Sequence, residues 1–156
     1  SRIKFVVFAT YSLIRTQRAM LDCIFCKIIS GELPSSKVYE DEAVVAFLDI
    51  RPTTPGHTLV VPKTHCDTIV DCDPSVLAQM IQVAQKIAPA VVKAALAEGF
   101  NLGVNSGATA GQIIFHLHMH VIPRRNNDGL HLWPSGEYRE GEMVRIAEQI
   151  RNTLTR

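Results

Sequence analysis

The alternation of apolar and polar positions along the chain predicts several short strands. Val44 to Ile50 is β-branched and aromatic enough for one strand, and His57 to Val61 for a second. Residues 51–56 lie between them and contain two prolines and a glycine, so this pair is predicted to form a hairpin. Phe100 to Asn105 and Ile114 to Ile122 predict two further strands, joined by a loop of small residues.

Two helices are predicted from the same pattern. The first begins at Asp73, a favourable N-cap, with Pro74 at the first helical position, where a missing N–H costs nothing. Apolar residues then recur at helical spacing, and we expect Pro89 to kink the helix and Gly99 to provide its left-handed C-cap. Glu140 to Leu154 carries its apolar residues on one side and predicts a C-terminal helix.

Strands joined by short loops, with helices inserted, predict an α+β fold on an antiparallel sheet of about five strands. Residues 20–156 contain no Pro/Gly/Ser-rich linker and no repeat, so we expect one domain there.

Residues 1–19 have a basic start and an interrupted apolar stretch without a cleavage pattern, and we expect a non-native or disordered N-terminal extension. We expect no apolar run of the length of a membrane span and no membrane partner.

Composition and charge narrow the class of ligand. The chain has 156 residues, 47% of them hydrophobic and 20% charged, which is typical of a soluble globular fold. Its net charge is +1 and its basic residues form no dense block, so it lacks the electrostatic footprint of a nucleic-acid binder. A small ligand is favoured over a polymer. An even count of four cysteines can indicate two disulfides, but a chain of this size is stabilised by burial, and we favour free thiols.

Three histidines at alternate positions carry the strongest chemical signal. In a strand, His116, His118 and His120 share one face, and the other face is apolar, with Leu117, Met119 and Val121. Three imidazoles in a row bury poorly and each offers two polar nitrogens. A solvated sheet face is the alternative, but a binding or catalytic surface explains the cluster better.

The segment His116 to Ile122 resembles the signature of the histidine-triad (HIT) family, which is His-x-His-x-His followed by apolar residues. The resemblance covers nearly the whole of residues 20–156 and excludes residues 1–19. Its other motifs stand in the family's order, at residues 23–29, 47–52, 55–63 and 111–112.

The resemblance implies nucleotide chemistry at the middle histidine. The family's middle histidine, here His118, becomes transiently nucleotidylated, which suits an imidazole with one free ring nitrogen at neutral pH. His120 would bind the phosphate oxygens where charge develops, and backbone N–H groups around Gly111, Gln112 and Ile113 would hold the anion. The implied substrate is a purine nucleoside phosphoramidate, mixed anhydride or dinucleoside polyphosphate, cleaved at the α-phosphate to release a nucleoside monophosphate.

The resemblance also assigns residues to nucleotide binding. Asp49 would accept hydrogen bonds from the ribose hydroxyls, and Asn105 and Gln112 would hold the phosphate region. The base would be walled by three apolar residues, Phe25, Ile28 and Leu48, for which an ordinary core position is the alternative. His57 would lie near the site, although it could equally be a hairpin residue facing the sheet. Many relatives carry Ser or Thr where this chain has Ile113, so a hydroxyl donor is absent there.

A zinc site is implied as well. Cys23-x-x-Cys26 supplies two ligands of a tetrahedral site, and taken alone it could be a redox pair. Relatives that carry this pair bind zinc with a histidine after the hairpin and the first histidine of the triad, here His65 and His116. Such a Cys₂His₂ set is closed and structural, so His116 would orient the triad segment rather than react.

The resemblance further implies a cytoplasmic homodimer that binds a purine, AMP-like nucleotide, since relatives join two sheets and so bury exposed strand edges. The competing hypothesis is a non-catalytic zinc-containing module that binds nucleotide or a partner without turnover. The pattern assigns no role to Cys66, Cys72 and His131.

Overall fold

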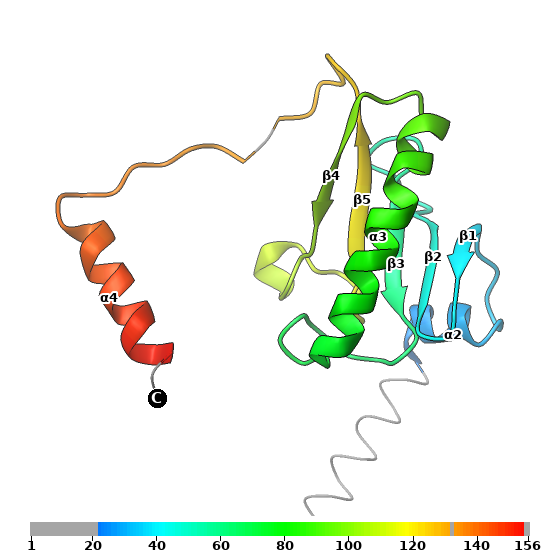
Figure 1. Ribbon diagram of the computed structural model, residues 1–156, viewed down its shortest axis with the longest axis horizontal. Helices are drawn as coiled ribbons and strands as arrows, with labels where there is room; N and C mark the ends of the chain where they lie inside the picture. The colour runs from blue at the N-terminus through cyan, green and yellow to red at the C-terminus, as the bar shows by residue number, and fades with distance from the viewer. Residues whose placement is uncertain (1–21, 132, 155–156) are drawn as a thin grey trace, which may run out of the picture. The chain divides into compact units, whose positions relative to one another are not determined.

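The computed structural model describes residues 22–131 and 133–154. The predicted extension at residues 1–19 lies outside the described residues. The chain divides after Asn126 into two compact units, which are described separately. The first unit holds the elements α2 (Ile24–Ile29), β1 (Lys37–Glu40), β2 (Val44–Leu48), β3 (Thr58–Pro62), α3 (Pro74–Ala94), β4 (Gly99–Gly103), the 3₁₀ turn η1 (Ala108–Ala110) and β5 (Met119–Arg124) (Figure 1).

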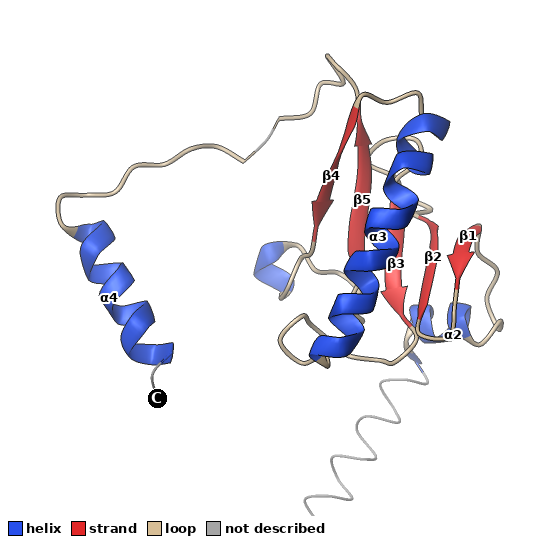
Figure 2. Cartoon of the chain, viewed as in Figure 1, coloured by secondary structure: helices blue, strands red, loops and turns tan. Residues whose placement is uncertain are grey.

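The first unit is built on one antiparallel sheet with the strand order β1-β2-β3-β5-β4. The predicted α+β class and the sheet of about five strands are confirmed (Figure 2). The predicted hairpin is β2 and β3, in a register that places Val44 opposite Pro62 and Leu48 opposite Thr58. The pattern singled out neither the four-residue strand β1 nor the six-residue helix α2, which are too short for a clear period.

The central strands are covered on both faces. Val44, Ala46 and Val60 belong to a core cluster with the apolar side of α3, and α3 lies across that face in Figure 1. The alternate residues of the same strands belong to a second cluster with α2, formed by Cys23, Phe25, Ile28, Val45, Phe47, Leu59 and Val61. Because side chains alternate between faces, a strand buried on both sides is apolar over most of its length, as β2 and β3 are.

Helix α3 begins as predicted, since the Asp73 carboxylate accepts a 2.8 Å hydrogen bond from the N–H of Ser75. The helix continues through Pro89, which is exposed, so the carbonyl that lost its donor faces water. The predicted C-cap at Gly99 is wrong. The left-handed residue is Leu96, with φ of 52°, and Gly99 is the first residue of β4.

By length and composition α3 is apolar enough to cross a membrane, which corrects the reading that no run reaches that length. Its buried residues, among them Met80, Val83 and Ile87, pack on the sheet. Its other side carries the exposed Gln82 and Lys86. A two-sided helix of this kind is what a sheet-covering helix requires.

The histidine run differs from the predicted strand. The strand predicted over 114–122 begins only at Met119, so His116 and His118 precede β5. The ladder with β3 stops because Pro62 has no N–H, and its carbonyl accepts from the His116 side chain instead of from backbone. The alternation still holds, since Leu117 and Met119 lie in the α3 cluster, while both histidine rings meet Phe25 of the α2 cluster.

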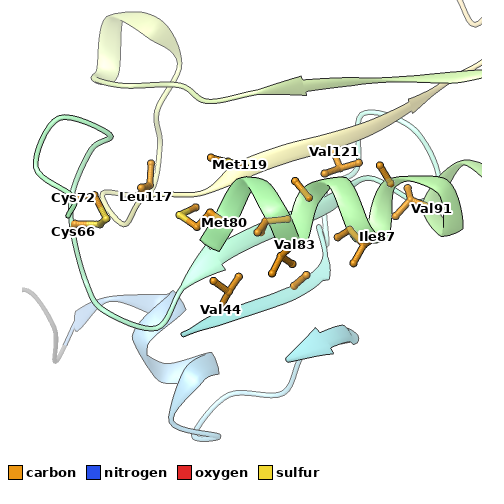
Figure 3. Close-up of a cluster of buried hydrophobic side chains, with 14 residues drawn as sticks. Val44, Cys66, Cys72, Met80, Val83, Ile87, Val91, Leu117, Met119 and Val121 are labelled. Carbon is orange, nitrogen blue, oxygen red and sulfur yellow. A yellow bond between two sulfur atoms is a disulfide. The ribbon is translucent and has the colours of Figure 1, made fainter. Parts of the chain in front are cut away.

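The expectation of free thiols holds for Cys23 and Cys26 and is wrong for the other pair. Cys66 and Cys72 form a disulfide in the loop between β3 and α3. Figure 3 shows the pair at the edge of the α3 cluster.

The second unit contains α4 (Glu142–Leu154), two residues shorter than the predicted helix. The Glu142 carboxylate accepts a 3.0 Å hydrogen bond from the N–H of Arg139 and so supports the helix start.

Candidate active site and metal centre

Two cysteines of α2 and two histidines from distant segments meet at one point. The ligand atoms of Cys23, Cys26, His65 and His116 all lie within 4.8 Å of one another. The Sγ atom of Cys26 is 3.3 Å from Nδ1 of His65 and 3.5 Å from Nδ1 of His116. Cys23 Sγ is 3.4 Å from the same His116 nitrogen. The four residues implied by the family pattern are therefore brought together.

The second nitrogen of each histidine is held by an acceptor. Nε2 of His116 donates to the carbonyl of Pro62 over 2.8 Å. Nε2 of His65 donates to a carboxylate oxygen of Asp67 over 3.0 Å. A carbonyl or carboxylate can only accept, so both Nδ1 atoms keep their lone pairs and face the thiols. This is the orientation that metal-binding histidines need.

The electrostatics of the cluster favour a cation. Burial raises the pKa of the Cys26 thiol to about 12, and the adjacent Cys23 adds to the rise. Burial also lowers the pKa of His116 to about 4, which leaves its imidazole neutral. Both thiols can therefore lose their protons only if a positive charge lies between them, and a neutral imidazole is a ligand rather than a cation.

The donor set fits zinc. Tetrahedral zinc with its usual bond lengths separates a sulfur and a nitrogen ligand by about 3.6 Å. The sulfur to nitrogen distances of 3.3, 3.4 and 3.5 Å are slightly shorter than this value. With four protein ligands, the site leaves no open position and is structural in character.

The middle histidine of the run is fixed in one tautomer. Nδ1 of His118 lies 2.7 Å from the carbonyl oxygen of His116, so this nitrogen carries the proton and donates it. The opposite nitrogen, Nε2, therefore keeps its lone pair. Phe25 meets the His118 ring edge to face, with centroids 5.2 Å apart, and the His118 side chain is buried. The ring is held in place with its unprotonated nitrogen on the side away from His116.

The last histidine of the run is oriented by His57. The N–H of Thr53 donates to Nδ1 of His57 over 3.1 Å, so His57 carries its proton on Nε2. That atom is 2.9 Å from Nδ1 of His120 and donates to it. His120 is then protonated at Nε2, which is buried without a hydrogen-bond partner among the described residues. This histidine relay, which runs from Thr53 through His57 to His120, presents one buried N–H donor that is free for a ligand.

Both histidines of this relay are neutral at neutral pH. Burial lowers the pKa of His57 below its usual range. Burial also lowers the pKa of His120 to about 4, with His118 and His57 nearby adding to the effect. His57 therefore lies directly beside His120, the histidine that the resemblance assigns to the phosphate.

Asp49 follows the last residue of β2 and lies beside the relay. One carboxylate oxygen accepts a 2.8 Å hydrogen bond from the N–H of Arg51, and the other is 3.8 Å from Nδ1 of His57. The ligand-type atoms of Asp49, His57 and His120 lie within 4.8 Å of one another. The local bond to Arg51 orients the carboxylate and leaves its second oxygen toward the histidines.

The loop before the histidine run differs from expectation. The N–H groups of Gly111 and Gln112 donate within the turn, to the carbonyls of Ala108 and Gly107 at 3.0 and 3.1 Å. They are not free for an anion, because η1 uses them. Ile113 follows directly after this hydrogen-bonded turn, and its side chain is exposed.

The side chain of Gln112 is also occupied. Its amide NH₂ donates to the carbonyls of Asp67 and Ile114 at 2.6 and 3.1 Å, and its Oε1 accepts from Gly107 N–H at 2.8 Å. Gln112 is 4% exposed, so it ties two loops together in the interior. Gly111, with φ of 89°, brings the chain against Asn105, where a Cβ would sit 3.4 Å from the amide nitrogen.

The three predicted base-wall residues divide into two groups. Phe25 and Ile28 are buried in the α2 cluster, where the core alternative placed them. Leu48 is exposed at the end of β2.

Three participants were not predicted from the sequence: Asp67, Thr53 and Pro62, which hold His65, His57 and His116 in turn. For Asp67 a signal existed, because metal-binding histidines commonly donate their second ring N–H to a carboxylate and Asp67 is close to His65 in sequence. Thr53 and Pro62 act through backbone atoms, which side-chain patterns do not reveal.

Comparison with known proteins supports these geometric findings. A family model described as HIT domain matches residues 30–127. The chain is 48% identical over 118 residues to adenylylsulfatase HINT3 of Arabidopsis thaliana, covering 76% of this chain and 59% of that protein. It is 36% identical to adenosine 5'-monophosphoramidase hnt1 of Schizosaccharomyces pombe, covering 86% of this chain and 99% of that one.

Solved structures agree with the fold and with the metal centre. A Streptococcus mutans protein superposes with a TM-score of 0.80 at 42% identity, covering 85% of each chain. A Zn-bound histidine triad family protein from Mycobacterium smegmatis has a TM-score of 0.69 at 40% identity, covering 88% of this chain and 99% of that one. The chain belongs to the HIT family, which includes this Zn-bound protein, and its Cys23, Cys26, His65 and His116 are positioned to bind a metal ion.

Proposed function

We propose that this protein is a nucleotide hydrolase in which Nε2 of His118 attacks the α-phosphorus of a purine nucleotide. The observation that carries the proposal is the 2.7 Å hydrogen bond from Nδ1 of His118 to the carbonyl of His116. It leaves Nε2 as a buried, unprotonated nucleophile without the need for a separate base. The relatives named adenylylsulfatase and adenosine 5'-monophosphoramidase support an adenosine nucleotide as the substrate class.

In the first step a bond forms between Nε2 of His118 and phosphorus, and the bond from phosphorus to the leaving group breaks. The imidazole becomes positively charged, and the carbonyl of His116 stabilises that charge by accepting from Nδ1–H. Nε2–H of His120, which is buried and has no hydrogen-bond partner in the part of the chain that the structure describes, donates to a phosphate oxygen on which charge develops. An acid anhydride partner or a nucleotide leaves as its anion, and a phosphoramidate amine leaves with a proton taken from water.

In the second step water attacks the phosphorus of the nucleotidyl-His118. The bond from phosphorus to nitrogen breaks, and its electron pair returns to Nε2, so the imidazole departs neutral with Nδ1 still protonated. The products are a nucleoside monophosphate and a proton released to solvent. Splitting the displacement in this way replaces one difficult step by two easier ones.

The remaining site residues are assigned to binding. We assign the second oxygen of Asp49 to the ribose hydroxyls, since its first oxygen is already used by Arg51. Leu48 is exposed and is assigned to the base, with Phe25 and Ile28 behind it. Ile113 and Asn105 are assigned to the phosphate region, with Gly111 and Gln112 shaping the loop. Zinc, when bound, links α2 to His116 and so holds the carbonyl that His118 needs.

A single-turnover experiment tests the reaction. Wild-type protein should release AMP from an adenosine phosphoramidate, while His118→Ala should bind the nucleotide and lose turnover by about 10³-fold or more. His131→Ala is the matched control, because His131 is an exposed histidine to which the proposed reaction assigns no role. Equal background rates in wild type and His118→Ala, with nucleotide still bound, would instead support the non-catalytic binding module.

We also propose a homodimer joined through the β4 edge. β4 is an end strand of the sheet, and its Phe100 and Leu102 are exposed. An exposed apolar edge invites pairing with another strand. Sedimentation of the full chain should give twice the mass of one chain, and Leu102→Lys should shift it toward the monomer. In this proposal residues 20–156 form one HIT domain, with 127–156 included.

A further inference from the structure

The disulfide between Cys66 and Cys72 has no task in the reaction proposed above. It joins residues with a sequence separation of 6, each 8% exposed. A short loop removes less entropy from the unfolded chain than a long one does, so stabilisation by cross-linking is modest here. Figure 3 shows the pair beside Leu117 and Met80, in the same core cluster.

The loop closed by this disulfide is joined to the metal centre and to the histidine run. His65, the residue before Cys66, places Nδ1 3.3 Å from Cys26 Sγ. The carbonyl of Cys66 accepts a 2.7 Å hydrogen bond from the N–H of Leu117, which stands between the first two histidines of the run. A change in the backbone at Cys66 would therefore shift both the metal ligand His65 and the histidine run.

A third connection runs to the loop before the histidine run. The carbonyl of Asp67 accepts a 2.6 Å hydrogen bond from the buried amide of Gln112. Through its other end, that amide accepts from Gly107 N–H at 2.8 Å. The residue after Cys66 thus braces the turn that leads to Ile113.

The outer part of the disulfide loop is open to solvent. Val70 is 85% exposed and Ile69 37% exposed. The loop is closed internally by Thr68 and Asp71, whose hydrogen bonds are on the surface. Local opening of these surface bonds would admit a small thiol or disulfide to the buried sulfurs.

We propose that Cys66 and Cys72 form a redox-sensitive site that controls the metal centre and the nucleotide site. In the disulfide state the loop holds His65 and Gln112 where the structure has them. Reduction releases the constraint next to both residues, which weakens zinc retention and nucleotide binding together. The part of this inference that concerns nucleotide rests on the function proposed above.

The chemistry is thiol–disulfide exchange with a low-molecular-weight disulfide. One thiolate of the pair attacks the small disulfide, forms a mixed disulfide and expels one small thiolate. The second thiolate of the pair then attacks the first cysteine's sulfur and expels the other. The two cysteines lose two electrons and two protons, and the small disulfide becomes two thiols. Excess small thiol reverses both steps.

The test uses the zinc-loaded full chain equilibrated in buffered mixtures of reduced and oxidised glutathione. Alkylation followed by mass spectrometry assigns the state of each cysteine. Reduced wild type should release zinc to a chromophoric chelator at least about fivefold faster, and bind AMP at least about fivefold more weakly, than the disulfide form. Cys66→Ser with Cys72→Ser should behave like reduced wild type in every mixture.

Three results would overturn the proposal. One is a difference below about twofold between the two redox states of wild type in both measurements. Another is a double variant that still responds to glutathione as wild type does, which would place the response at Cys23 and Cys26. The third is the absence of a Cys66–Cys72 disulfide in every mixture. Failure of AMP to bind in either state refutes the proposed function instead, while zinc release still decides the loop's role.

Discussion

Nε2 of His57 lies 2.9 Å from Nδ1 of His120, and the N–H of Thr53 on the far side of His57 fixes the direction of the hydrogen bond between them. A backbone group in the β2–β3 turn thereby decides which nitrogen of His120 carries its proton. The turn is predictable from its prolines and glycine, but its effect on a histidine of another strand follows only from the fold.

The first prediction is that His57→Ala lowers kcat by about 10- to 100-fold with little change in KM, since His120 loses the partner that orients it. His57→Gln should recover part of the loss, because its amide can accept from Thr53 and donate to His120. Steady-state kinetics on an adenosine phosphoramidate measure both. A rise in KM at unchanged kcat in His57→Ala would mean that His57 only binds substrate.

The sequence was most informative where function is carried by side-chain type. The resemblance to the HIT family led to the metal cluster of Cys23, Cys26, His65 and His116, and the apolar periodicity led to β2, β3 and α3. Metal binding requires ligand side chains such as Cys and His, and burial in the core requires apolar ones, so both leave a mark in the sequence.

The sequence was least informative where a side chain forms hydrogen bonds with backbone groups of other segments. The run of histidines has the pattern of a strand, yet the Pro62 carbonyl is taken by a histidine side chain and the ladder stops. The resemblance assigns Gln112 to the phosphate region, yet its side-chain amide makes hydrogen bonds to three backbone groups. Long-range hydrogen bonds decided both cases.

The second prediction concerns Asp67, which holds Nε2 of His65 over 3.0 Å. Asp67→Ala should weaken zinc affinity about 10- to 100-fold, because the ligand ring loses its orienting acceptor. Competition with a chelator measures the effect. Glu42→Ala is the matched control, since Glu42 is an exposed carboxylate in the loop between β1 and β2. Equal affinities in the two variants would contradict an orienting role.

The third prediction concerns removal of the metal. Metal analysis should find about one zinc per chain, lost in Cys23→Ser with Cys26→Ser. If free zinc exceeds its dissociation constant a thousandfold, chelation should lower the free energy of unfolding by about 4 kcal/mol. Denaturant unfolding with and without chelator measures this difference. Metal-free wild type of unchanged stability would argue against a structural zinc.

The fourth prediction is a loss of stability in mild acid. The pKa of His120 is lowered from 6.5 to about 4 in the folded protein. Between these values the unfolded chain binds a proton that the folded protein does not, so the free energy of unfolding falls as pH decreases from 6.5 toward 4. The lowered pKa of His57 acts in the same direction.

For His120 alone the expected loss between pH 7 and pH 5 is about 2 kcal/mol. Urea unfolding of the zinc-loaded protein across this range should show a shallower dependence in His120→Gln than in wild type. His131→Gln, which removes an exposed histidine, should keep the wild-type slope. The same slope in all three proteins would show that His120 is not held neutral.

The fifth prediction follows from the end of α3, where Leu96 has φ of 52°. This left-handed conformation is strained for leucine and free of strain for glycine. Leu96 is also 80% exposed, so its side chain contributes little burial. Leu96→Gly should therefore raise the free energy of unfolding by about 0.5 to 1 kcal/mol, even though glycine adds flexibility to the unfolded chain.

Leu96→Ala separates the backbone effect from the loss of the leucine side chain. Alanine removes the same exposed apolar group but keeps a Cβ, so it retains the strain and should give no gain. Denaturant midpoints of the two variants, compared at equal slope, measure the difference. If alanine stabilises as much as glycine, the leucine side chain rather than its φ is the cause. If glycine destabilises, the left-handed position costs leucine less than flexibility costs glycine.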